Sequence, residues 1–153
     1  MRMVGLWALT LSVAGVIFWF SAQSAAESSA VSNAVTGGVF GWLFDLLRLT
    51  EGQRETTHEL IRSGAHVLLF ALLGFSTSLL TRSYRLRCWV AVTVGSCAAY
   101  AVLDECHQLW RAAGRAFEWM DIVKDVSGVL LGVGVVALLC RLAVRKQRGI
   151  DRA

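Results

Sequence analysis

The chain has 153 residues, of which 56% are hydrophobic, and its mean hydropathy is +0.56. This composition excludes an ordinary soluble domain, and the length leaves room for only one small domain. The formal net charge of +4 comes from scattered basic residues and not from a basic patch with interleaved aromatic residues, so the sequence also argues against a nucleic-acid partner. We therefore expect a small integral membrane protein.

Four apolar runs approach or reach the ~20 residues that a helix needs to cross the hydrocarbon core of a bilayer. They cover residues 3–20, 63–81, 88–108 and 122–140. The uncharged parts of the last two runs are a little short, so acidic residues must complete both spans. The pattern predicts an all-α integral membrane four-helix bundle. It forms a single transmembrane domain over residues 1–146, followed by a basic cytoplasmic tail over residues 147–153.

The connections between the runs differ in charge, and this difference predicts the orientation of the chain. Basic residues dominate at both ends of the chain and in the connection at residues 82–87, whereas the other two connections carry more acid than base. Positive loops stay in the cytoplasm. We expect a multi-pass protein of the cell membrane with both termini cytoplasmic and both acidic loops outside. A cleaved signal peptide ending near residues 21–26 is the alternative, although the first run is longer than a usual signal core.

Three further patterns concern helices. Residues 35–49 are strongly apolar but are interrupted by glycine and charge, which predicts a short interfacial helix in the first outer loop. Thr50 and Gln53 then match a capping box, so a new helix is expected to begin there and to continue into the second span. In the fourth run, Ser127-Gly128 with Gly132 form a small-residue stripe that is typical of helix packing.

Polar and ionisable side chains at the end of the third run and around the start of the fourth form two groups. Asp104, His107 and Gln108 are separated by three and four positions, so they share one face if the third span stays helical. Asp121 and Asp125 repeat this spacing at the head of the fourth span, with Lys124 as an ion-pair partner for either. Charged groups at the mouth of a membrane span are costly to desolvate and are usually functional.

The predicted orientation places polar residues of the first two spans at the same depth. His66 lies near the outer end of the second span, and Ser21 and Gln23 follow the first. We therefore predict one outward-facing site. Its candidate catalytic residues are His66, Asp104, Glu105, His107, Gln108, Asp121 and Asp125, and its candidate substrate-binding residues are Ser21, Gln23, Arg62 and Arg115.

Three chemistries use such a set of residues. Histidine and carboxylate side chains can bind a divalent metal, which leaves a metal cofactor open. The same groups can act without a metal as general acid and base. Arg62 and Arg115 can hold a phosphate or a carboxylate. The alternative is a structural one, in which Arg62 and Arg115 pair with Asp121 and Asp125 and lock the helix ends together.

Read in order, these residues resemble the signature of the VanZ-like family. The segments that carry the resemblance are Phe20–Ser24, Arg62–His66, Ala99-Tyr100 leading into Asp104–Gln108, Gly114-Arg115, and Asp121–Asp125 with Gly128. They fall within residues 16–134, nearly the whole domain. Two positions depart from the family: Ser63 stands where a lysine is frequent, and Phe70 where a tyrosine is frequent. The missing lysine removes a basic contact.

The resemblance implies a small polytopic bacterial membrane protein whose founding relative is associated with resistance to the lipoglycopeptide antibiotic teicoplanin. It supplies no established reaction, so whether the chain is an enzyme stays open. Our first hypothesis is a protein that acts on or binds a membrane lipid headgroup or a lipid-linked envelope precursor at the outer leaflet. The second is a non-catalytic membrane protein that limits access of a glycopeptide to its target. A proton-coupled carrier ranks last, because the chain shows no repeat.

Overall fold

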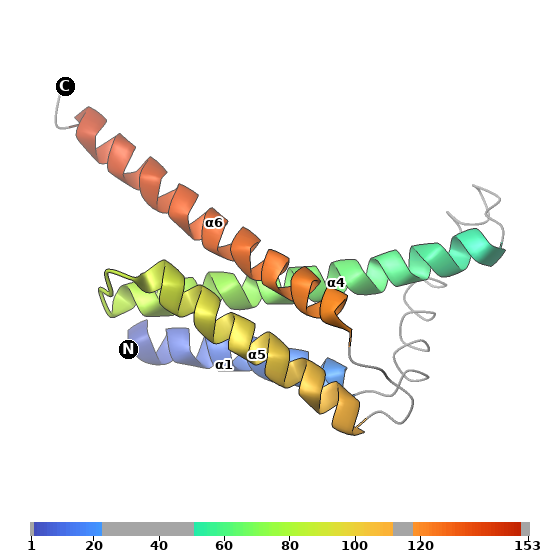
Figure 1. Cartoon of the computed structure of the whole chain (residues 1–153). Coiled ribbons are helices and arrows are strands. Elements are labelled where there is room, and N and C mark those ends of the chain that lie inside the picture. Colours follow the sequence, from blue (N-terminus) through green and yellow to red (C-terminus); the bar gives the residue numbers. More distant parts are fainter. Residues whose placement is uncertain (1, 23–50, 112–117, 151–153) are drawn as a thin grey trace.

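A computed structural model describes residues 2–22, 51–111 and 118–150 (Figure 1). These residues form four helices, which are α1 (Arg2–Ser21), α4 (Glu51–Ser83), α5 (Trp89–Arg111) and α6 (Trp119–Ile150). The prediction of an all-α four-helix bundle is confirmed. The interfacial helix predicted at residues 35–49 and the cap at Thr50 lie outside the described residues.

Each helix contains a stretch that is long and apolar enough to cross a membrane. These stretches are Met3–Ser21, Ser63–Ser83, Trp89–Trp110 and Trp119–Arg148, close to the four predicted runs. Large apolar side chains remain exposed along them, as for Leu103 and Trp110, which are 65% and 89% exposed. Such exposure suits a surface that faces lipid, and the chain is a multi-pass membrane protein. Helix α6 continues past the predicted domain boundary at residue 146 to Ile150.

Helices α4 and α6 cross in close contact (Figure 1). Three glycines lie at the crossing, where a Cβ added to Gly74 would come 2.6 Å from the Val129 carbonyl oxygen. A Cβ on Gly128 or Gly132 would overlap the α4 backbone even more closely. Small residues let two helix backbones approach in this way, so the predicted packing role of Gly128 and Gly132 is confirmed.

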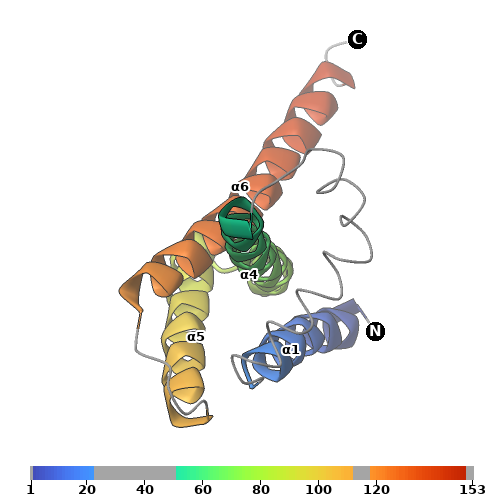
Figure 2. The ribbon, with the colours of Figure 1, turned by 90° about the vertical axis from the view of Figure 1, so that its right-hand side faces the viewer.

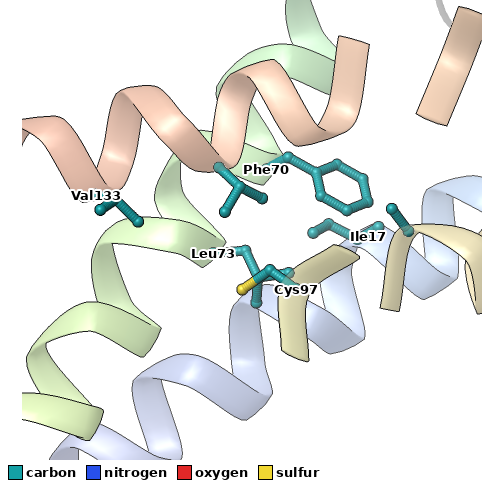
Figure 3. Close-up of a cluster of buried hydrophobic side chains, with 7 residues drawn as sticks. Ile17, Phe70, Leu73, Cys97 and Val133 are labelled. Atoms are coloured by element: carbon teal, nitrogen blue, oxygen red, sulfur yellow. The ribbon is translucent and has the colours of Figure 1, made fainter. Parts of the chain in front are cut away.

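Helix α4 makes the most extensive contacts with the other helices and lies between α1 and α6 in the end-on view (Figure 2). A small apolar core lies where the four helices meet (Figure 3). Its buried members are Ile17, Phe70, Leu73, Cys97, Ala101, Val129 and Val133. Helices α1 and α5 run antiparallel to α4, whereas α6 crosses α4 in the same direction (Figure 1). The last turns of α1 and α5 therefore come to the same end of the bundle as the first turns of α6.

The opposite end of the bundle is marked by the turn between α4 and α5. Arg85 has a positive φ of 56°, and its amide donates a hydrogen bond of 2.9 Å to the Arg82 carbonyl. Trp7 Nε1 donates to the Tyr84 hydroxyl at 2.9 Å, and the Arg82 guanidinium lies 5.1 Å from the centre of the Trp89 ring. Tryptophan and arginine at this level suit a membrane–water interface.

Candidate functional site

Polar side chains from all four described helices converge at one end of the bundle. We call this group the polar end and define it as Ser21 of α1, His66 of α4, Asp104 and Gln108 of α5, and Asp125 of α6. Four of the five are buried, with Ser21 and Asp104 only 2% and 3% exposed. Exposed tryptophans near the ends of the same helices, Trp19, Trp110 and Trp119, suit the level of a membrane interface.

Asp104 is held by neutral donors from two helices. The Ser21 hydroxyl donates a hydrogen bond of 2.6 Å to Asp104 Oδ2, and Gln108 Nε2 donates to the same oxygen at 3.0 Å. Gln108 is one helical turn after Asp104, so both face α1. The second carboxylate oxygen, Asp104 Oδ1, is buried and has no hydrogen-bond partner among the described residues.

His66 and Asp125 connect α4 to α6. His66 Nδ1 lies 3.6 Å from Asp125 Oδ1, a contact between an imidazole and a carboxylate that is too long for a hydrogen bond. The Asp125 side chain is only 6% exposed, and that of His66 is 28% exposed. Asp104 and Asp121 also interact electrostatically with both members of this pair. The direct contact of His66 is therefore with the fourth span, and its electrostatic interaction with Asp104 relates it to the third.

His107 lies on the same face of α5 as Asp104 but contacts a different residue of α1. Its ring stacks on Phe18 of α1, with ring centroids 4.2 Å apart and an interplanar angle of 26°. His107 Nδ1 is buried and has no hydrogen-bond partner in the described part of the chain. His107 and Asp104 thus both face α1, but the structure gives them separate partners. Phe18 is not among the predicted site residues, although it precedes Ser21 by one turn and so shares its face.

Two other candidate residues fasten the helix ends. Glu105 Oε1 accepts a hydrogen bond of 2.9 Å from the Glu118 amide, which ties the start of α6 to α5. Asp121 Oδ1 lies 2.6 Å from Lys124 Nζ one turn along α6, so the structure selects Asp121 from the two predicted partners of Lys124. These contacts give Glu105 and Asp121 clear structural roles, and their catalytic roles stay predictions.

The remaining candidates cannot be placed at the polar end from the described residues. Gln23 and Arg115 lie outside them, and so does the side chain of Arg62, whose backbone is one turn before His66 in α4. Anion binding by the two arginines and their alternative pairing with aspartates both stay predictions. In the described ranges, no three His, Cys, Asp or Glu side chains are placed so that they could share one metal ion.

Four membrane-capable helices with polar groups buried together at one end define a multi-pass helical membrane protein. The family described as VanZ/LLP1 matches residues 6–141, which include every member of the polar end. The chain therefore belongs to the VanZ/LLP1 family, in agreement with the resemblance carried by its motifs. No curated protein and no solved structure matches the chain.

Proposed function

We propose that the polar end binds a lipid headgroup or a lipid-linked envelope precursor at the outer leaflet of the membrane. The observation that carries this proposal is the convergence of buried Asp104 and Asp125 with partly exposed His66, from three helices, into one interacting group. Ionisable residues in membrane segments are costly and are commonly retained for function. A purely structural lock would satisfy its buried atoms, whereas Asp104 Oδ1 receives no hydrogen bond from the described residues.

The geometry also supports a division of roles within the site. His66 is partly exposed and lies against Asp125, an arrangement in which a carboxylate can orient an imidazole that takes up or releases a proton. Asp104 is fixed by Ser21 and Gln108. Arg62 and Arg115, if they reach the same site, would hold the phosphate of the bound headgroup. We propose that His66 is the general base or acid and that Asp104 contacts the ligand.

Lipid and cell-wall precursor profiling of a deletion strain tests this function. The deletion is expected to change the amount of one headgroup or precursor species, and the wild-type gene should restore it. His66→Ala should fail to restore it while the inserted protein stays within about twofold of wild type. Cys106→Ala is the matched control, because Cys106 lies at the same end of α5 and is exposed.

The result for His66→Ala separates a functional site from a structural one. If the effect of His66→Ala follows the amount of inserted protein, the polar end is a structural lock and the proposed function is wrong.

Expression in a teicoplanin-susceptible bacterial host is expected to raise tolerance modestly, by changing or occupying the envelope component that the antibiotic approaches. A well-inserted protein that leaves tolerance unchanged would exclude this consequence.

The outward orientation of the polar end can be tested with single cysteines. Glu118 lies next to the polar end, whereas Cys88 lies at the opposite end of the bundle, and both are exposed. In variants that otherwise lack cysteine, a membrane-impermeant maleimide added to intact cells should label Glu118→Cys but label Cys88 only after permeabilisation. The reverse pattern would place the site in the cytoplasm and contradict the proposed location.

A further inference from the structure

Asp104 and Asp125 at the polar end each have a buried oxygen without a hydrogen-bond donor. As whole residues Asp104 and Asp125 are 3% and 4% exposed, and neither Oδ1 atom has a hydrogen-bond partner among the described residues. A buried carboxylate oxygen without a donor is unfavourable, because its desolvation is not compensated. Asp104 Oδ2 already accepts two hydrogen bonds, so only the Oδ1 atom of that carboxylate lacks a hydrogen-bond donor.

The charges of the described residues also leave the two carboxylates without full compensation. Asp104 and Asp125 interact electrostatically with each other, and both interact with His66. One imidazole can balance at most one of these two carboxylates. The nearby amine of Lys124 is already paired with Asp121 at 2.6 Å. Within the described part of the chain these two carboxylates therefore lack both full charge compensation and a hydrogen-bond donor at Oδ1, and a cationic ligand with N–H groups would supply both.

We propose that the ligand of the polar end carries a primary ammonium group, and that Asp104, assisted by Asp125, binds it. An ammonium group supplies one positive charge and three N–H donors, which matches carboxylate oxygens that lack donors. At the membrane interface such a group is available from a lipid with an amine headgroup, and we infer that this lipid is the substrate class. The inference rests on the proposed function and names its ligand chemistry.

Binding of matched lipids to the purified full-length chain in nanodiscs tests the inference. Phosphatidylethanolamine and phosphatidylcholine carry the same charge, but methylation removes every N–H donor from the second. Wild-type protein should bind phosphatidylethanolamine about tenfold more tightly, the difference expected for one charge-assisted hydrogen bond. Asp104→Asn should reduce this preference to less than about threefold. Glu118→Gln, which removes an exposed carboxylate nearby, should preserve it.

Three results would overturn the inference. The first is equal binding of the two lipids by wild-type protein, which decides the matter even if Asp104→Asn fails to insert. The second is an undiminished preference in a well-inserted Asp104→Asn variant. The third is saturation of the site by free ethanolamine or by sodium ion at concentrations that leave lipid binding unchanged, which would assign the carboxylates to a soluble amine or an inorganic cation.

Failure of this inference can be told apart from failure of the proposed function. Tighter binding of phosphatidylglycerol, which has no amine, would contradict an ammonium ligand but would leave a headgroup-binding site at the polar end. Loss of binding to all lipids in wild-type protein would contradict both.

Discussion

The α4–α6 crossing and the seam between α1 and α5 hold the bundle together in different ways. At the crossing, Gly128 and Gly132 bring the two backbones into direct contact. In the seam, α1 and α5 are connected by the Tyr100–Ala14 hydrogen bond, the Phe18–His107 stack and the Ser21–Asp104 hydrogen bond. The first interface depends on the absence of side chains, and the second depends on a few specific ones.

This difference matters because the polar end lies across both interfaces. His66 and Asp125 belong to the crossing, where packed backbones fix their relative positions. Asp104 belongs to the seam, where a substitution removes one side-chain contact and does not force the helix backbones apart. We therefore expect substitutions at the crossing to reduce folded protein, and substitutions in the seam to leave the fold largely intact.

The largest effect is expected for Gly132→Ala, which directly breaks the crossing. The added Cβ would overlap the Ala71 carbonyl and the Phe75 amide of α4, so the helices must move apart. Overpacking of this kind costs about 1–3 kcal/mol of folding free energy. Gly134→Ala is the matched control, since a Cβ there meets nothing within 4 Å. Thermal unfolding in detergent should show a lower midpoint for Gly132→Ala alone. Equal midpoints for the two variants would contradict the claim that close backbone packing at the crossing stabilises the bundle.

A smaller effect is expected for Tyr100→Phe in the seam. The Tyr100 hydroxyl donates a hydrogen bond of 2.7 Å to the Ala14 carbonyl, and only this contact is removed. Hydrogen bonds between membrane helices contribute about 0.6 kcal/mol on average. The ring stays in place, 6.3 Å from that of Phe70. The unfolding midpoint should fall by less than for Gly132→Ala. A larger fall would show that the seam contributes more to the stability of the bundle than the crossing does.

The smallest effect is expected for Lys124→Ala. Lys124 and Asp121 are 37% and 34% exposed, so their ion pair is screened by solvent or headgroups. Such pairs contribute about 0.2–1 kcal/mol. Unfolding should shift by no more than this, and activity per inserted protein should be unchanged. A strong loss of activity would mean that Lys124 also balances the charge of the buried aspartates.

The spans and the common depth of the polar residues could be predicted because both follow from one-dimensional patterns. Run lengths located the helices, and the alternating direction of successive spans placed His66 at the same end of the bundle as Asp104. The small-residue stripe at Gly128 and Gly132 likewise predicted a packing face, and the structure shows that α4 occupies it.

The individual partners could not be predicted, because they depend on helix rotation and crossing angle. Helical spacing grouped His107 with Asp104, yet the rotation of α1 places Phe18 against His107 and Ser21 against Asp104. The His66–Asp125 contact arises from the glycine crossing, and no spacing within either helix encodes it. Gln23, Arg62 and Arg115 stay predictions, since their side chains lie outside the described part of the chain.

The central claim is that distant helices meet at the polar end, and thiol cross-linking in native membranes tests it most directly. In a cysteine-free background, Ser21→Cys combined with Asp104→Cys should cross-link within one chain with a short bifunctional thiol reagent, since Ser21 Oγ and Asp104 Oδ2 are 2.6 Å apart. The control pair, Ser21→Cys with Leu103→Cys, should not, because Leu103 is 65% exposed on a different face of α5.

His66→Cys with Asp125→Cys provides the second pair, across α4 and α6. We predict efficient cross-linking of both polar-end pairs and little of the control. Inserted protein in which neither polar-end pair cross-links, or in which the control pair reacts as readily, would contradict a single site built from four helices.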